Sequence, residues 1–368
     1  MPASTAVGAE VESLEVSVYT VPLEDEESDG TLEWSSVTMI LVEVTAGGQT
    51  GLGYTYGDQA VATLVRSKLA DHVEGADALC PEAAWASMQR AIRNAGRPGV
   101  GAMAISGVDV ALWDLKAKLL GVCLADALPR FHRSVPVYGS GGFTSYSDER
   151  LAEQLSTWVD MGIPRAKIKT AREPDRDPHR LKVARNAIGD ETELLVDANG
   201  AFTRKDALLW ASRYSDFGVT YLEEPVTSED REGLRMVRDR GPAGLAVAAG
   251  EYEWDLPQLA DLSGCVDILQ ADVTRCGGVT NMLRVDGICK GRNMPFSAHC
   301  APAISAHVCC AIESVEHIEY FHDHVRAEKL LFDGTLDPRG GSLEPDRSRP
   351  GLGLELKRQE AAKLQVRS

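Results

Sequence analysis

From Pro136 onward, the chain alternates short apolar runs with longer stretches in which apolar residues recur at helical spacing. The short runs predict eight strands: VPVYGSGG, AKIKT, ELLVDAN, VTYLEEP, LAVAAGE, VDILQAD, MPFSAH and HIEYF. Amphipathic stretches such as DERLAEQLSTWVDMG separate them. Alternation this regular favours a closed parallel barrel over an open doubly wound sheet. No Gly-rich dinucleotide-binding motif follows any of these strands, which also disfavours the open sheet.

The first part of the chain has a different pattern. EVSVYTVPL and SSVTMILVEVTAG alternate like strands, and the Gly-rich GQTGLGYTYG follows them, so an antiparallel meander is predicted. We expect the acidic segment LEDEESDG (23–30) to form a polar loop between the first two strands. Residues 58–130 read as helices, one of which ends at Gly121. Residues 1 to about 12 are expected to be frayed.

Three regions follow from these patterns. We expect an N-terminal α+β capping domain over residues 1–132 and a barrel over residues 133–345. Residues 346–368 contain a short strand-like piece, which we expect to return and pack on the capping domain. The predicted fold class is therefore α/β, with a barrel and a smaller second domain.

Composition narrows the possible partners. The 368 residues are 44% hydrophobic, enough for a large core. The net charge of −17 argues against nucleic acid as a partner, because phosphate backbones require clustered Lys and Arg. No apolar run approaches the roughly 20 residues that span a bilayer, and MPASTAVGAEVES does not resemble a signal peptide. The eight Cys show no CxxC spacing, so reduced thiols in a cytoplasmic protein are expected.

Charged residues close most of the predicted strands at nearly constant intervals. They are Lys169, Asp197, Glu223, Glu251, Asp272, His299 and Glu319, and their numbers differ by 28, 26, 28, 21, 27 and 20. A strand with its returning helix takes roughly 20 to 35 residues, so this is the period of repeated βα units. In a βα barrel such strand ends converge on one mouth, where catalysis takes place.

Asp197, Glu223 and Glu251 close three consecutive strands. Three carboxylates at one mouth would repel one another unless a cation lies among them. Mg²⁺ suits all-oxygen ligation, whereas the absence of His and Cys from the trio disfavours zinc. A single carboxylate of this kind would more often be a cap or a surface charge. Glu224 should point away from the barrel interior or support the ligands from behind.

Lys167 and Lys169 are separated by one residue, so they share one face of their strand. We expect that face to be the barrel interior. The charge of Lys167 should then lower the pKa of Lys169 and make Lys169 a catalytic base. The alternative is that both side chains only extend to solvent.

His299 and Asp272 lie on adjacent predicted strands, on the other side of the barrel from the Lys strand. A carboxylate bonded to one ring nitrogen fixes the tautomer and raises the basicity of His. A second catalytic base is therefore favoured over a core histidine. Glu319 either hydrogen-bonds a substrate carboxylate in its protonated form or is an ordinary charge at a strand end.

These residues resemble the enolase superfamily, and within it the mandelate racemase subgroup. The resemblance covers nearly the whole chain and rests on KIK (167–169), VDANG (196–200), EEP (223–225), GE (250–251), Asp272 with CGGVT after it, and SAH (297–299). The helix AISGVDVALWDLKAKLLG and the closing PGLGLEL are also similar.

The resemblance implies a capping domain over a modified (β/α)₇β barrel. It also implies Mg²⁺ on Asp197, Glu223 and Glu251. Lys169 and the His299–Asp272 pair would be bases on opposite faces of a small-molecule carboxylate substrate. Lys167 would contact that carboxylate, and Glu319 would match the acid that stabilises the enediolate. A homo-oligomer (dimer, tetramer or octamer) is expected only because related proteins assemble that way.

Three functions follow in order of preference. The first is dehydration of a sugar acid to a 2-keto-3-deoxy acid, the second is racemisation or epimerisation of an α-hydroxy acid, and the third is a non-catalytic metal-binding role. Specificity is expected in the capping domain, with Glu24, Tyr54 and Tyr56 as candidates. A solvated, mobile loop is the favoured interpretation of the acidic 23–30 segment; the alternative is that it disfavours a substrate with a second carboxylate.

Overall fold

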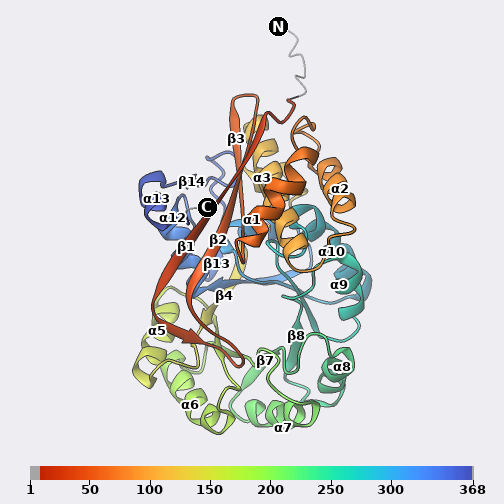
Figure 1. Ribbon diagram of the computed structural model, residues 1–368. Helices are drawn as coiled ribbons and strands as arrows, with labels where there is room; N and C mark the ends of the chain where they lie inside the picture. Colours follow the sequence, from red (N-terminus) through yellow and green to blue (C-terminus); the bar gives the residue numbers. More distant parts are fainter. Residues whose placement is uncertain (1–8, 367–368) are drawn as a thin grey trace.

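Eight parallel strands close into a barrel in the structure, a computed structural model that describes residues 9–366 (Figure 1). The first and last of them pair directly with each other, and an antiparallel strand, β13 (Ser342–Leu343), adds to the first. The barrel strands are β4 (Val135–Gly141), β5 (Arg165–Lys169), β6 (Glu193–Asp197), β7 (Val219–Glu223), β8 (Ala246–Ala249), β9 (Ile268–Ala271), β10 (Phe296–Ala298) and β11 (Val315–Phe321). The eight strands predicted from the sequence are therefore confirmed.

Seven helices connect successive barrel strands and form an outer ring, which gives the (β/α)₇β arrangement. They are α5 (Asp148–Asp160), α6 (Asp177–Ile188), α7 (Arg204–Ser215), α8 (Arg231–Arg240), α9 (Leu256–Leu262), α10 (Gly278–Arg292) and α11 (Pro302–Cys309). Several begin at a side-chain cap, such as Ser147 before α5 and Thr203 before α7. Their apolar faces pack on the strands in one continuous core.

The capping domain contains an antiparallel sheet of β1 (Ser13–Ser28), β2 (Glu33–Ala46) and β3 (Gln49–Tyr56). Its helices are α1 (Ala60–Leu64), α2 (Pro81–Ala91), α3 (Val100–Leu120) and α4 (Leu124–Ala127). The long α3 packs on β2 and β3 and ends at Gly121, whose φ of 69° suits glycine. The expected fraying lies partly outside the described residues. Within them, the Val11 and Glu12 amides donate to Ala76 and Thr45.

The expectation of a polar loop over residues 23–30 was wrong. β1 continues to Ser28, and only a tight turn closed by the Asp29 carboxylate joins it to β2. The acidic residues form a bulge, because the pairing with β2 shifts register between Pro22 and Glu27. The β1–β2 arm reaches over the barrel (Figure 1). A Cβ at Gly30 would lie 2.5 Å from the Ala198 carbonyl oxygen, so the tip of this arm presses directly on the strand ends.

The end of the chain returns to the capping domain. After α12 (His322–Leu331), β12 (Phe332–Asp333) pairs with β14 (Glu355–Leu356), and α13 (Arg358–Leu364) packs near β1. The Leu352 amide donates to the buried Asp114 carboxylate of α3 at 2.6 Å, and the Val366 amide donates to Val18. Within residues 9–366, no helix is long and apolar enough to cross a bilayer.

Candidate active site

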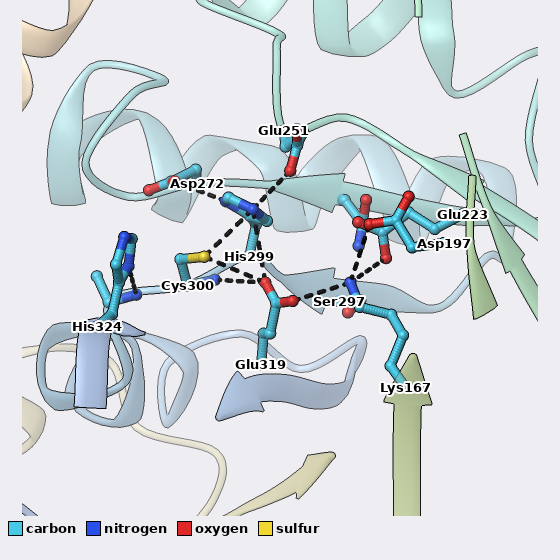
Figure 2. A network of polar contacts seen from close by, with 12 residues as sticks. Lys167, Asp197, Glu223, Glu251, Asp272, Ser297, His299, Cys300, Glu319 and His324 are labelled. Atoms are coloured by element: carbon cyan, nitrogen blue, oxygen red, sulfur yellow. Dashed lines mark hydrogen bonds and ion pairs between the residues drawn. The ribbon is translucent and has the colours of Figure 1, made fainter. Parts of the chain in front are cut away.

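The strand-end residues predicted from the sequence converge at one end of the barrel (Figure 2). A cavity of about 660 Å³ opens there, between the barrel mouth and the capping domain. Lys169, Glu251, His299 and Glu319 line it. Lys167, Asp197, Glu223 and Asp272 lie directly behind these residues and are almost completely buried. All eight were expected to meet at this place.

The two lysines point into the barrel and are held by carboxylates. Lys167 Nζ lies 2.5 Å from Glu223 Oε2 and 2.8 Å from Glu319 Oε1 (Figure 2). Lys169 Nζ lies 2.6 Å from Asp197 Oδ2. Neither side chain extends freely to solvent, so the alternative interpretation of this pair is wrong.

The expected direction of the Lys169 pKa shift was also wrong. Burial and the charge of Lys167 both lower the pKa of Lys169, but the adjacent Asp197 carboxylate raises it, and the net pKa is raised. The local sequence contains only the like charge two residues away. The opposite charge on the neighbouring strand is closer and therefore prevails.

His299 lies between two carboxylates. Its Nδ1 is 2.7 Å from Asp272 Oδ2, and its Nε2 is 2.6 Å from Glu251 Oε2 (Figure 2). Burial alone would lower the pKa of His299, yet the surrounding anionic groups raise it well above its usual value. In this arrangement the ring joins Asp272, its expected partner, to Glu251, an expected metal ligand.

Glu319 is held as a carboxylate. Burial favours its protonated form, but Lys167 and His299 lower its pKa well below the usual value. Its Oε2 accepts from the Cys300 amide at 3.1 Å. The protonated state that the sequence argument required of Glu319 is therefore disfavoured in this structure.

The three expected metal ligands close consecutive strands, and Asp197 and Glu223 are register partners. Burial and the neighbouring Asp197 raise the pKa of Glu223 to about 7. The buried Glu223 Oε1 has no hydrogen-bond partner among the described residues. An all-oxygen set with an unpaired buried oxygen fits Mg²⁺. Among residues 9–366, however, the ligand oxygens of Asp197, Glu223 and Glu251 do not all lie within 4.8 Å of one another. An ion between them would compete with the Glu251–His299 ion pair.

Backbone geometry supports the placement of these acids. Gly250, just before Glu251, has φ of 145°, and a Cβ there would lie 2.0 Å from the Gln270 carbonyl oxygen. Only glycine allows this approach of β8 to β9. Glu224 adopts a φ of 36° and is buried rather than turned to solvent. Burial and the nearby Glu251 raise the pKa of Glu224 well above its usual value.

Two residues at the site were missed by the sequence analysis. The backbone N–H of Asn199 donates to Asp197 Oδ1 at 2.8 Å, and Asn199 lines the cavity. Cys300 Sγ lies 3.2 Å from His299 Nε2 and 3.3 Å from Glu319 Oε2. Cys300 and Ala301 both have positive φ, and this strained turn directs the Cys300 amide toward Glu319. The position of Cys300 directly after His299 was the available signal.

The three specificity candidates have different locations. Tyr56 lines the cavity and stacks on His324 with ring centroids 3.5 Å apart. Tyr54 does not line it: this side chain is fully buried and its hydroxyl donates to Glu328 at 2.6 Å. It shares a face of β3 with Tyr56 but lies two residues further from the strand end. Glu24 does not line it either, because the β1 bulge carries it toward a smaller pocket on the outer side.

Comparison with known proteins agrees with this geometry. The family model "Enolase C-terminal domain-like" matches residues 150–361, and "Mandelate racemase / muconate lactonizing enzyme, N-terminal domain" matches residues 17–128. Together with the barrel and its capping domain, these matches show that the chain belongs to the mandelate racemase subgroup of the enolase superfamily.

Four relatives illustrate its range. A mandelate racemase/muconate lactonizing enzyme-like protein from Rubrobacter xylanophilus is 70% identical, with a TM-score of 0.96 over 97% of this chain and all of that one. The 3,6-anhydro-alpha-L-galactonate cycloisomerase of Streptomyces coelicolor is 31% identical over 97% of this chain and 99% of its own. The L-talarate/galactarate dehydratase of Salmonella typhimurium is 27% identical over 96% and 90%. A Streptomyces coelicolor racemase solved with bound magnesium has a TM-score of 0.91, 28% identity, and coverage of 97% and 100%.

Proposed function

We propose that this protein is a magnesium-dependent enzyme that removes the proton α to the carboxylate of a sugar acid and then eliminates the β-hydroxyl as water. One observation carries the proposal. Lys169 on β5 and His299 after β10 face one cavity from different sides of the barrel, and the carboxylates that follow β6, β7 and β8 lie between them in strand order. Two groups that can hold a proton therefore flank one carboxylate-lined site.

Each residue has a role in this proposal. Asp197, Glu223 and Glu251 would hold Mg²⁺, which when bound supplies a positive charge for the substrate carboxylate. In its deprotonated form, Lys169 or His299 removes the α-proton, and the other group, in its protonated form, donates a proton to the departing hydroxyl. Asp272 accepts from His299 Nδ1, which fixes the ring orientation so that Nε2 faces the cavity. The ammonium of Lys167, fixed behind the cavity, stabilises negative charge that develops on the substrate.

The cavity favours a substrate with a single carboxylate. Among the described residues, the basic side chains that line it are Lys169, His299, Arg275 and His324. Arg275 is paired with Asp272 at 3.4 Å, and burial lowers the pKa of His324 to about 3, which leaves that ring neutral. The charged lining cations already have carboxylate neighbours, and Asp29, Asp58 and Asp323 would repel a second substrate carboxylate. Hydroxyl groups of Thr20, Ser36 and Thr38 suit a polyol tail.

A second candidate is isomerisation at the same site. The cycloisomerase named above is similar over nearly the whole chain. If the oxygen on the β-carbon belongs to a ring ether, the same elimination opens the ring and no water is lost. Racemisation requires both bases to act in sequence on the α-carbon, and both are present.

The test is proton NMR of the purified protein with Mg²⁺ in D₂O, over matched mono- and dicarboxylic sugar acids and α-hydroxy acids. A 2-keto-3-deoxy product whose mass is lower by one water supports dehydration. A product of unchanged mass supports cycloisomerisation, and α-deuteration with inversion supports racemisation. Turnover of a dicarboxylic acid in preference to its monocarboxylic analogue would contradict the specificity. Absence of both product formation and α-proton exchange over the whole library would contradict the proposal.

We also infer a cytoplasmic homo-oligomer. All eight cysteines are free, which fits a reducing compartment. Size-exclusion chromatography with light scattering would test the assembly, and a monomeric mass would refute it.

A further inference from the structure

The acidic bulge of β1 forms a second cluster of potential metal ligands, on the outer side of the barrel mouth. Pairing between β1 and β2 breaks after Pro22 and resumes at Glu27, so residues 23–26 leave the ladder. Where the ladder resumes, Glu27 turns inward and meets His322 and Asp323, the first two residues of α12. One ligand atom from each of the three lies within 4.8 Å of the others.

Two oxygens of this cluster are buried and have no partner. Glu27 and Asp323 are 6% and 1% exposed. The Tyr146 hydroxyl donates to Glu27 Oε1, and the Trp34 indole donates to Asp323 Oδ2, both at 2.8 Å. The second oxygens, Glu27 Oε2 and Asp323 Oδ1, receive no hydrogen bond from any described residue. Each carboxylate is thus oriented by one donor and leaves its other oxygen for a ligand.

The surroundings admit an ion and supply negative charge. A pocket of about 100 Å³ adjoins the cluster and gives a path from solvent. Glu24 and Asp25 from the bulge line this pocket, and so do Arg150 and Arg326. The positive charges of the two arginines balance the negative charges of Glu24 and Asp25. The carboxyl groups of Glu27 and Asp323 have no such balancing charge. Arg326 is also engaged with the Pro22 carbonyl oxygen at 2.7 Å.

The adjacent carboxyl of Asp323 opposes a negative charge on Glu27. Burial and the adjacent Asp323 raise the pKa of Glu27 to about 9. Burial also lowers the pKa of His322, so its ring is neutral and able to coordinate. Two carboxylates and a neutral imidazole suit Zn²⁺ or another divalent transition metal better than Mg²⁺.

We propose that Glu27, His322 and Asp323 form a divalent transition-metal site, distinct from the carboxylates that follow β6–β8, which ties the acidic bulge of the capping arm to α12 of the barrel. Trp34 and Asp323 both line the main cavity, so the tie holds one wall of that cavity in place. This gives the acidic segment a role other than repelling the substrate.

The experiment uses zinc as the probe. The full-length protein is dialysed against Zn²⁺ with a large excess of Mg²⁺, and its zinc content is measured by mass spectrometry alongside its melting temperature. His322→Gln removes one ligand from a partly exposed position. His72→Gln, an exposed histidine on the capping domain, is the matched control. We expect one bound zinc and a raised melting temperature in the wild type and in His72→Gln, and at least about a tenfold loss of zinc affinity in His322→Gln.

A second measurement locates the ion. His299, Cys300 and Glu319 form another group with ligand atoms within 4.8 Å, and that group contains a thiol. Co²⁺ bound at Glu27, His322 and Asp323 gives no thiolate charge-transfer band, whereas Co²⁺ on Cys300 does. The proposal is overturned if the wild type retains no zinc, if His322→Gln retains it with unchanged affinity, or if the cobalt spectrum shows the thiolate band. These readouts do not depend on turnover, so they are independent of the proposed reaction.

Discussion

The ammonium nitrogen of Lys167, on β5, lies 2.8 Å from Oε1 of Glu319, on β11. Both side chains are almost completely buried, and Glu223 lies on the other side of the same ammonium. Removing the charge of Lys167 leaves two buried carboxylates without their nearest cation. We expect Lys167→Met to lower the free energy of unfolding by about 3–5 kcal/mol, measured by urea denaturation.

Adding Glu319→Gln to Lys167→Met removes the carboxylate charge of Glu319. The double variant should therefore recover part of the free energy of unfolding that Lys167→Met loses. If the double variant is less stable by the sum of the two single changes, the ion pair contributes nothing specific.

Asp272 orients His299, so Asp272→Asn should impair the base without emptying the site. We expect kcat to fall by about 10²–10⁴-fold, the range for loss of a positioned base. His299→Asn should cost about as much, and the double variant little more, because the two residues act as one unit. Steady-state kinetics on the substrate identified by NMR would measure this. Fully additive effects would contradict a shared role.

Lys169→Met tests the other base. We expect a loss of kcat of about 10²–10⁴-fold with the fold retained. Lys205→Met, which changes an exposed lysine on the outer α7, is the control and should leave kcat unchanged. Retention of wild-type α-proton exchange by Lys169→Met would assign the base to His299 alone.

Removing divalent ions should abolish activity, because the buried carboxylates at the barrel mouth then lose the cation that they would hold. We expect EDTA followed by gel filtration to abolish turnover and added Mg²⁺ to restore it. Ca²⁺ should restore less, since it prefers longer bonds and more ligands. Glu223→Gln should raise the Mg²⁺ concentration needed. Full activity after exhaustive chelation would contradict magnesium dependence.

Glu328 makes stability depend on pH. Burial raises its pKa to about 8, although the hydroxyl of Tyr54 lowers it. Between about pH 4.5 and pH 8, the folded state keeps this proton while the unfolded chain has lost it. Stability therefore falls as pH rises through this window, by up to about 1.4 kcal/mol per pH unit, and levels off above pH 8. Urea denaturation of the wild type and Glu328→Gln across pH 4–9 measures the difference, which should grow with pH. A constant difference would contradict it.

Cys300 should be the thiol whose modification matters for activity. It lines the cavity, but burial raises its pKa well above the usual value, so it should react slowly with iodoacetamide. Cys80 is exposed and should react first without loss of turnover. Peptide mapping against residual activity would follow the two. Inactivation that tracks Cys80 would refute this assignment.

Some of this protein is determined locally by its sequence. The alternation of strand and helix patterns predicts the eight barrel strands, because period 2 and period 3.6 are properties of short segments. The interval between Lys169, Asp197, Glu223 and Glu251 places them at one mouth, because every βα unit returns the chain to the same end. The inward direction of Lys167 follows from the same periodicity.

The tertiary structure alone decided which groups meet. Asp197 lies 2.6 Å from Lys169 and reverses the pKa shift expected from Lys167, because strand pairing places an opposite charge closer than the like one. Tyr54 is withdrawn from the cavity by its bond to Glu328, 274 residues further along the chain. The acidic segment is a strand bulge rather than a loop because β1 resumes its pairing with β2 at Glu27. Such partners come from distant parts of the chain, so no local pattern contains them.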